Sequence, residues 1–587
     1  MDHNIKLRSK SLRISSPSSS QSSLGTQDDE KPRRSQSRTF GVANRVWLIV
    51  VLVLVTILLL HRLLPGPTQP PLPSYASGDL HPKNYLNSSS SSPSPPPNPF
   101  PFCPSNGPSD TLAAKYGASG LSQTRRFQGT GFRVQRVLRR ALSGQPVTIS
   151  VIGGSISACH GAGDSPISPK CYVSKFFDWW NTVFPHPATE ITNGAMRRTS
   201  SDYFGYCSAH HLPDVTDLVI VELDSDDTPD AEKTTNFEFL IRSLLLRPDQ
   251  PAVIILGHFS PQVYQTWSLT GPDHWHSIVA SHYDVPHLTT KPLLYDDYVE
   301  NPDSIRKKYY ADPILANPNG HTLLSDVLIA YFQSMTCQSW HVITGEEYDP
   351  TTGTYKEKGG GGGGLFGGVG LRKGVPEPKA KPDNPSEDSS SDSANTDRTK
   401  PKSPSSDPRL KVPQSLVSLP RSSSHRSSGQ FDELAPYCVS ANDLINPLPP
   451  SLFYGSGWQI YHPSTSQSSS RHDTVEGGAT AAHYFYSTLP LSRIRIPIVV
   501  GHGDVGVYYL REDWAGRGGG SEIECWVDDN YSGRKTLRNG KEGKGVEVML
   551  TLIDRFVAKG SHYVECQLMG EEGQGVSMFK IVGIFAN

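Results

Sequence analysis

The sequence has no surplus of positive charge and lacks the usual metal-binding motifs. Its 587 residues include 55 lysines and arginines against 57 aspartates and glutamates, a formal net charge of −2. Broad nucleic-acid binding needs a basic domain or stripe, so we expect no nucleic-acid partner. None of the eight cysteines forms a CxxC pair, and no HExxH segment occurs. Because zinc sites use such spacings, we expect neither a metal nor another cofactor.

Charged residues are also sparse, at 19% of the chain, and the 52 glycines and 49 prolines are locally concentrated. Residues 65–127 include the run SSSSSPSPPPNPFP, and residues 346–430 include GGGGGGLFGG. Segments of this composition do not bury enough apolar surface to fold. We predict a stalk over 65–127 and a flexible tether over 346–430, with a short docking piece at Leu365 and Phe366.

One apolar run has the length of a membrane span. Residues 46–64 read VWLIVVLVLVTILLLHRLL, close to the ~20 residues that cross a bilayer. The run starts after 45 residues, and Pro65 follows it without a small-residue cleavage site, unlike a signal peptide. We predict a transmembrane signal-anchor helix over 46–64; a buried core helix is the alternative.

Charge and cysteine positions predict the orientation of that helix. Residues 1–45 hold nine Lys or Arg against four acidic residues, which places them in the cytosol as a disordered basic tail. All eight cysteines and the sequons at Asn87 and Asn530 follow the run, as expected in an oxidising compartment. We expect a type II single-pass glycoprotein of the Golgi or plasma membrane, with a Cys525–Cys566 disulfide between two strand-like runs.

Residues 128–345 alternate short apolar runs with amphipathic stretches. VTISVIGG (147–154), TDLVIVELD (216–224) and PAVIILGHF (251–259) have strand character. Helical spacing occurs in YVSKFFDWWNTVF (172–184) and GHTLLSDVLIAYF (320–332). This alternation predicts an α/β domain with a doubly wound parallel sheet and helices on both faces.

Residues 431–587 have a different pattern. EIECWVDD, VEVMLTLIDRFV, HYVECQLM and FKIVGIF are short strand-like runs separated by Gly-rich turns. They predict an antiparallel β-sandwich. Aromatic residues of this block, among them Tyr508, Tyr509, Trp526 and Tyr531, could form a sugar-stacking platform, although core packing is the commoner role.

A serine follows the first strand of the α/β block, in Gly153-Gly154-Ser155-Ile156-Ser157. Two glycines permit a tight turn and a close backbone approach at the carboxyl edge of a parallel sheet, where such sheets bind ligands. An ordinary turn is the alternative. Next in the chain come Asn193-Gly194, an acidic cluster after the third strand, and a D…N-P-N-G-H segment before the last helix. Blocks of this kind in this order resemble the SGNH (GDSL-type) hydrolase family.

The resemblance covers residues of about 145–335 and implies a flavodoxin-like three-layer fold with esterase-type chemistry. It implies that Ser155 is the nucleophile and that its own backbone N–H helps to hold the oxyanion. Gly194 corresponds to a further oxyanion donor, and Asp226 stands where the family's asparagine lines the same hole. Within this resemblance we expect His321 to be the general base, oriented by Asp312.

Two blocks depart from the family pattern. The third, usually G-x-N-D, reads Asp224-Ser225-Asp226-Asp227, and a carboxylate donates no hydrogen bond unless it is protonated. Loss of one oxyanion donor costs about 10²–10³ in turnover. In the last block, D-x-x-H would place a histidine three residues after Asp312, where Leu315 stands. Either His321 serves as the base in a shortened loop, or it is a packing residue and the base is absent.

We therefore predict an enzyme that hydrolyses or transfers O-acyl groups, acetyl foremost, on an acylated carbohydrate. The alternative is a catalytically degenerate relative that presents a glycan- or protein-binding surface. The acidic run from Glu222 to Asp230 is expected to be a solvated loop, with calcium binding as the less common outcome. The sequence indicates no oligomeric state.

Overall fold

The structure is a computed structural model that describes residues 38–39, 42–43, 49–56, 80–87, 96–345, 410–416, 435–442, 454–461, 483–514, 519–542 and 546–587. The chain divides into two compact units, residues 1–73 and 74–587. In the first unit, β1 (Arg38–Thr39) and β2 (Val42–Ala43) pair antiparallel. The predicted span at 46–64 is described only over 49–56, which is helical. No helix within the described ranges has the length and apolar character needed to cross a bilayer.

The α/β domain is built on a six-stranded sheet with the order β3-β8-β7-β6-β4-β5. The strands are β3 (Arg125–Phe127), β4 (Thr148–Gly153), β5 (Glu190–Asn193), β6 (Leu218–Glu222), β7 (Ala252–Gly257) and β8 (His287–Thr289). Strands β4 to β8 are parallel, and β3 is antiparallel at the edge. The residues of β6 and β7 are all buried, as in a sheet covered on both faces. The doubly wound parallel sheet predicted from the sequence is confirmed.

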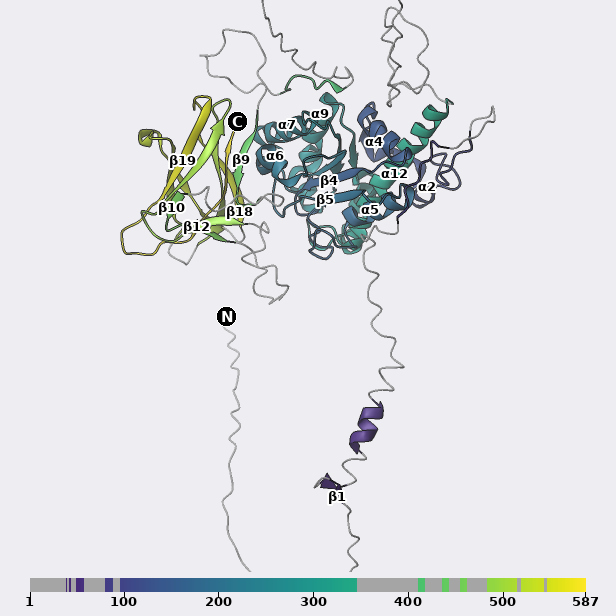
Figure 1. Cartoon of the computed structure of the whole chain (residues 1–587), viewed down its shortest axis with the longest axis horizontal. Helices are drawn as coiled ribbons and strands as arrows, with labels where there is room; N and C mark the ends of the chain where they lie inside the picture. Colours follow the sequence, from purple (N-terminus) through teal and green to yellow (C-terminus); the bar gives the residue numbers. More distant parts are fainter. Residues whose placement is uncertain are drawn as a thin grey trace, which may run out of the picture. The chain divides into compact units, whose positions relative to one another are not determined.

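Helices cover both faces of this sheet (Figure 1). They are α2 (Thr111–Tyr116), α3 (Ala118–Gln123), α4 (Phe132–Leu142), α5 (Tyr172–Val183), α6 (Ser201–Cys207), α7 (Ala231–Leu245), α8 (Pro261–Trp267), α9 (Pro272–His282), α10 (Tyr295–Glu300), α11 (Pro302–Tyr309) and α12 (Pro318–Thr344). Val151 and Ile220 share a core with α4, α5 and α12, whereas Ile152 and Val221 share one with α6, α7 and α9. Because successive strand residues face opposite sides, the two cores lie on opposite faces of the sheet.

Part of the predicted stalk belongs to the α/β domain. Phe100 and Phe102 are buried in the core that contains α5 and α12, and a disulfide joins Cys103 to Cys337 of α12. The elements α2, α3 and β3 follow before residue 128. The boundary predicted at 128 is therefore wrong, because a few aromatic residues among the prolines supply apolar surface that averaged composition conceals.

A piece of the predicted tether, residues 410–416, also packs on the α/β domain. Arg133 Nη2 donates to the carbonyl of Leu410 at 2.9 Å, and His282 Nε2 donates to the carbonyl of Gln414 at 2.9 Å. The docking piece predicted at Leu365 and Phe366 lies outside the described residues. Within the described ranges, the tether therefore contacts the domain through a different segment.

The C-terminal domain is a sandwich of two sheets. Its strands are β9 (Tyr437–Ser440), β10 (Tyr454–Ser456), β11 (Gln459–Tyr461), β12 (Tyr484–Ser487), β13 (Arg493–Val500), β14 (Val505–Asp513), β15 (Glu522–Val527), β16 (Lys535–Arg538), β17 (Gly540–Lys541), β18 (Glu547–Asp554), β19 (Gly560–Leu568) and β20 (Phe579–Ala586). One sheet has the order β10-β13-β19-β15-β16, and the other β11-β12-β20-β14-β17, with β18 on β14 and β9 on β20. Alternate residues of β13, such as Ile494 and Ile496, fill the core. The predicted β-sandwich is confirmed; β14 and β17 form a short parallel pair within it.

All eight cysteines are paired, and none is free. The predicted Cys525–Cys566 bridge joins β15 to β19. The others are Cys103–Cys337, Cys159–Cys171 and Cys207–Cys438, of which the last links α6 to β9 and so ties the two domains together. Four disulfides without a free thiol indicate a secreted or extracellular, oxidising environment.

Candidate functional site

Ser155 lies at the carboxyl edge of the parallel sheet, where the strand order reverses. β4 ends at Gly153, and its two neighbours are β5 and β6, the next strands in the chain. Ligands of open α/β sheets bind at such a switch point. The close approach predicted for the two glycines is present: a Cβ on Gly154 would lie 1.9 Å from Asp226 Oδ2, and one on Gly153 would lie 2.4 Å from Ser157 Oγ. The turn therefore sets Ser155 against the loop that follows β6.

Two groups hold the Ser155 hydroxyl. Its Oγ lies 3.1 Å from Asp226 Oδ1 and accepts a hydrogen bond of 2.8 Å from the backbone N–H of Arg198. The backbone N–H of Ser155 donates to Asp226 Oδ2 at 3.0 Å. Because Arg198 donates to Oγ, the hydroxyl proton is directed to the carboxylate. Ser155 is only 5% exposed.

Burial raises the pKa of Asp226 to about 7. The hydrogen bonds from Ser155 act in the opposite direction, the Asp227 carboxylate adds to the rise, and the Arg198 guanidinium opposes it. At neutral pH the Asp226 carboxyl is therefore present both as the carboxylate, which accepts a proton, and as the protonated acid, which donates one. The sequence predicts Asp226 only as a defective oxyanion donor, and no motif indicates its direct contact with Ser155.

Within the described residues, His321 forms no hydrogen bond with Ser155. It is fully buried in the first turn of α12, its Nδ1 accepts a hydrogen bond of 3.3 Å from the Tyr172 N–H, and its ring stacks on that of Tyr172. The backbone of His160 is a further hydrogen-bond partner of the His321 ring. Burial lowers the pKa of His321 to about 3, so the ring stays neutral. Of the two roles that the sequence left open, this geometry fits the packing residue.

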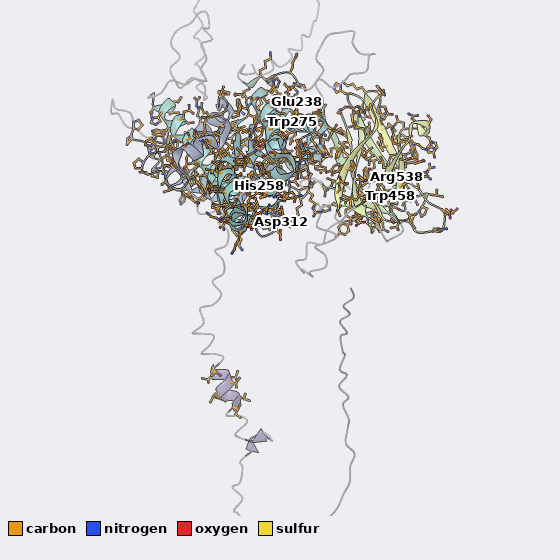
Figure 2. All side chains as sticks on the ribbon, turned by 180° about the vertical axis from the view of Figure 1, so that it is seen from behind. Glu238, His258, Trp275, Asp312, Trp458 and Arg538 are labelled. Atoms are coloured by element: carbon orange, nitrogen blue, oxygen red, sulfur yellow. A yellow bond between two sulfur atoms is a disulfide. The ribbon has the colours of Figure 1, made fainter. Side chains whose placement is uncertain are left out.

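Asp312 forms no hydrogen bond with His321 within the described residues. It lies exposed on the α/β domain (Figure 2), and its Oδ1 accepts hydrogen bonds of 2.8 and 2.7 Å from the backbone N–H groups of Ile314 and Leu315. It therefore shapes its own turn. Within the described residues, Ser155, His321 and Asp312 share no hydrogen bond, and the expected relay is not assembled.

The Gly194 N–H, expected from the second block to face Ser155, is hydrogen-bonded elsewhere. The Gly194 N–H donates to the Val151 carbonyl at 2.9 Å, and a Cβ at this position would lie 2.3 Å from the His211 carbonyl oxygen. Gly194 is thus required by packing. The N–H that faces Ser155 belongs to Arg198, whose φ of 51° is in the left-handed region. A backbone donor leaves no signature in side-chain identity, so sequence reasoning missed it.

The acidic run after β6 contains buried residues, contrary to the solvated loop that we expected. Asp224 and Asp227 are 3% and 4% exposed, and the His276 imidazole bridges them at 2.7 and 3.0 Å. Burial acts to lower the pKa of His276, but the two carboxylates outweigh it and raise this pKa to about 9. Asp227 also accepts a hydrogen bond of 2.8 Å from the Ser201 N–H at the start of α6. The described ranges contain no group of three or more His, Cys, Asp or Glu placed to hold a metal ion.

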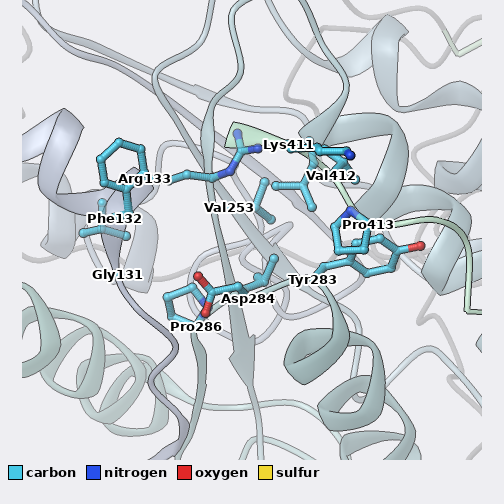
Figure 3. Close-up of a pocket in the computed structure, with 13 residues that line it drawn as sticks. Gly131, Phe132, Arg133, Val253, Tyr283, Asp284, Pro286, Lys411, Val412 and Pro413 are labelled. Atoms are coloured by element: carbon cyan, nitrogen blue, oxygen red, sulfur yellow. The ribbon is translucent and has the colours of Figure 1, made fainter. Parts of the chain in front are cut away.

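Two pockets lie elsewhere on the α/β domain. One, of about 320 Å³, opens beside Asp224 at the carboxyl ends of β6, β7 and β8 and is lined by His258 and Lys291 among others. The second, of about 550 Å³, lies at the amino ends of β7 and β8, where Figure 3 shows Pro413 of the tether against Tyr283. Ser155 lines neither pocket.

Three of the four aromatic residues named above for sugar stacking are core residues. Tyr508 and Tyr509 are buried, and Trp526 is buried with the Arg493 guanidinium 5.8 Å from its ring centroid. Tyr531 remains 47% exposed. The β-sandwich therefore uses this set chiefly to pack its sheets and to contact the α/β domain.

No family model matches the chain, and no curated protein matches it. Solved structures do. Two crystal structures of a two-domain esterase active on acetylated mannans, one co-crystallised with mannopentaose, match at 16% identity with a TM-score of 0.50; the match covers 79% of this chain and 98% and 97% of theirs. An acetyl xylan esterase from Geobacillus stearothermophilus matches over 32% of this chain and 94% of its own, at 16% identity and a TM-score of 0.26. The two-domain likeness supports the same fold class: an α/β domain followed by an antiparallel β domain.

Proposed function

We propose that this chain hydrolyses or transfers O-acyl groups, acetyl foremost, on glycans, with Ser155 as the nucleophile. The observation that carries the proposal is the position of Ser155 Oγ between the Arg198 N–H and the Asp226 carboxyl, at the switch point of the sheet. A serine hydroxyl becomes an effective nucleophile when a neighbouring base takes its proton. Asp226 is within reach, and a pKa near 7 suits a base that works at neutral pH.

In the acylation step, the Oγ proton passes to Asp226 Oδ1 while Oγ forms a bond to the acyl carbon. Once protonated, Asp226 no longer repels the oxyanion, which removes the conflict that a carboxylate causes at this position. The Arg198 N–H is already directed at Oγ and is the donor best placed for the developing charge. The bond to the sugar oxygen then breaks, and that oxygen takes a proton from a general acid and leaves as an alcohol. Water or a second sugar hydroxyl takes the acyl group from Ser155 and returns a proton to that acid, and the Asp226 proton returns to Oγ.

The substrate class is supported by the structures of similar two-domain fold, which are of an esterase active on acetylated mannans. An acetyl group is also the smallest common acyl group, which suits a serine that is 5% exposed. We therefore propose an acetylated polysaccharide as the first substrate to test.

We further propose that the chain is a type II membrane protein of the Golgi or plasma membrane, with residues 1–45 in the cytosol and both folded domains on the other side. Support comes from the apolar run at 46–64, from the basic excess before it and from the sequons at Asn87 and Asn530. The four disulfides agree with that compartment.

A second candidate function is a catalytically degenerate binding module. It is favoured by two observations: Leu315 stands where the family resemblance calls for a histidine, and His321 is buried and forms no hydrogen bond with Ser155 within the described residues. Such a protein would bind acetylated glycans without cleaving them.

A serine-directed fluorophosphonate probe separates the two candidates. We expect the wild-type protein and a surface control, Ser304→Ala, to be labelled and to release acetate from acetylated mannan. Ser155→Ala should lose labelling and lose at least about 10³-fold of the activity. A wild-type protein that binds the acetylated polysaccharide but is neither labelled nor active would support the binding module instead.

A further inference from the structure

A histidine lies close to the loop that carries Leu315. The loop after Ser155 packs directly on the loop before α12: a Cβ on Gly161 would lie 2.6 Å from the Ala316 carbonyl oxygen and 3.3 Å from the Ala311 side chain. Gly161 has a φ of 89°, so both its conformation and this contact require glycine. The residue before it is His160. The chain thus brings a second imidazole to the region where the family resemblance predicts a base.

His160 is connected to Ser155 and is oriented by an acidic residue. The His160 N–H donates to the Ser155 carbonyl at 3.1 Å. Its Nδ1 lies 2.5 Å from Asp164 Oδ1, and Arg197 Nη2 lies 3.1 Å from the same oxygen. Arg197 directly precedes Arg198, the residue whose N–H binds Ser155 Oγ. The cluster of His160, Asp164 and Arg197 therefore adjoins the Ser155 site at two points of the backbone.

Several constraints hold this loop in place. A disulfide joins Cys159 to Cys171, and Asn193 Nδ2 donates to the carbonyls of Ser157 and Pro166 at 2.8 and 3.0 Å. Cys159 adopts a φ of 62°. Non-glycine residues keep left-handed conformations where their surroundings enforce them, and such residues cluster at functional sites.

An ionised carboxylate orients the His160 ring. Burial acts to raise the pKa of Asp164, but His160 and Arg197 outweigh it and hold this pKa below its usual value. The carboxylate is therefore ionised and fixes Nδ1 of His160. Since the His160 side chain is 38% exposed, Nε2 is the ring nitrogen that a ligand can approach.

We propose that His160 is the general acid for the leaving sugar oxygen, with Asp164 as its positioning residue; this rests on the proposed function. When the acyl carbon–oxygen bond of the ester breaks, the Nε2 proton of the imidazolium passes to the sugar oxygen, which leaves as a neutral alcohol. In the second half of the reaction, the incoming water or sugar hydroxyl gives a proton back to Nε2 as its oxygen attacks the acyl-serine. Asp226 and Ser155 exchange their own proton, so each group ends as it began.

The test compares two esters that differ in their need for an acid. p-Nitrophenyl acetate has a leaving group that departs without a proton, whereas an acetylated mannan releases a sugar alkoxide unless it is protonated. For the full-length His160→Asn protein, we expect kcat/KM to fall at least about 10²-fold further on acetylated mannan than on p-nitrophenyl acetate, within the usual range of general-acid contributions. Asp164→Asn should change the ratio in the same direction. The matched control is His186→Asn, which lies in the loop before β5 at the amino edge of the sheet. Its kcat/KM values on both esters should equal those of the wild type.

Equal losses on both esters, or no loss on either, would overturn the role of His160 while leaving Ser155 chemistry intact. Labelling of Ser155 by the fluorophosphonate probe in the His160→Asn protein reports that the site is folded. A wild-type protein without Ser155-dependent cleavage of either ester would instead refute the proposed function, and the role of His160 with it.

Discussion

Replacing Asp226 by asparagine tests the chemistry of the Ser155 site more sharply than removing the serine does. Asparagine is the residue that the family resemblance places at this position, and its amide donates a hydrogen bond but does not take a proton. If Asp226 is the base, Asp226→Asn removes the proton acceptor 3.1 Å from Ser155 Oγ. If Asp226 is only an impaired oxyanion donor, the same substitution repairs it. The two roles therefore predict opposite changes in activity: a loss if Asp226 is the base, and a gain if it is an impaired oxyanion donor.

The expected changes in rate and in stability can both be estimated from the Ser155 site. Loss of a general base costs about 10²–10⁴ in rate, so we expect kcat/KM to fall by that factor. The wild-type rate should also rise with pH through about 7 as Asp226 loses its proton. For stability, a folded-state pKa of about 7 against an unfolded value near 4 is a difference of about three units, or about 4 kcal/mol.

The sign of the stability effect is set by the raised pKa. The unfolded carboxyl ionises near pH 4 and the folded one near 7, so the wild type loses stability as pH rises across that window. Asparagine does not titrate. Asp226→Asn should therefore melt at a higher temperature than the wild type at pH 8, by on the order of 10 °C at most, with a smaller difference at pH 4.

Acetate release from acetylated mannan and melting curves between pH 4 and 9 test this reasoning together. Ser155→Ala serves as the inactive reference. An Asp226→Asn protein that is as fast as the wild type, or faster, would refute the assignment of Asp226 as the base. A melting difference independent of pH would refute the raised pKa.

Two further substitutions test the structure around the serine. His276→Gln removes the cation between the buried Asp224 and Asp227 carboxylates and should cost about 3–5 kcal/mol of stability. Because the pKa of His276 is raised to about 9, the stability difference between wild type and variant should be full below about pH 6 and disappear as pH rises through 9. Melting curves across this pH range would detect the change. Gly154→Ala places a methyl group 1.9 Å from the Asp226 carboxylate and should abolish labelling of Ser155, whereas Gly575→Ala, where no atom lies within 4 Å, should label normally.

The features that sequence reasoning predicted correctly depend on local pattern. Buried strands such as β6 and β7 are continuous apolar runs, and the alternation of strands with amphipathic helices defines the doubly wound sheet. Ser155 could be placed at the carboxyl edge because it directly follows a predicted strand and the two glycines before it permit a tight turn. Cys525 and Cys566 could be paired because both lie in strand-like runs of one β domain.

The features that sequence reasoning missed depend on contacts between distant segments or on backbone groups. His276 belongs to α9, about 50 residues from the carboxylates that it bridges, and no motif connects them. Arg198 contributes an N–H, which any residue except proline would supply. His321 follows an Asn-Pro-Asn-Gly turn that resembles a functional block, but its burial is decided by packing against Tyr172.

The β-sandwich is connected to the segment that carries the Arg198 donor. Cys207 of α6 is disulfide-bonded to Cys438 of β9, and the Tyr203 hydroxyl lies 2.9 Å from Ser440 Oγ of the same strand. Arg198 Nη1 itself donates to the carbonyl of Val546 at 3.4 Å, just before β18. A left-handed arginine keeps its conformation only where neighbouring groups restrain it. The second domain therefore supports the geometry of the serine site directly, through the side chain of the residue whose N–H binds Ser155 Oγ.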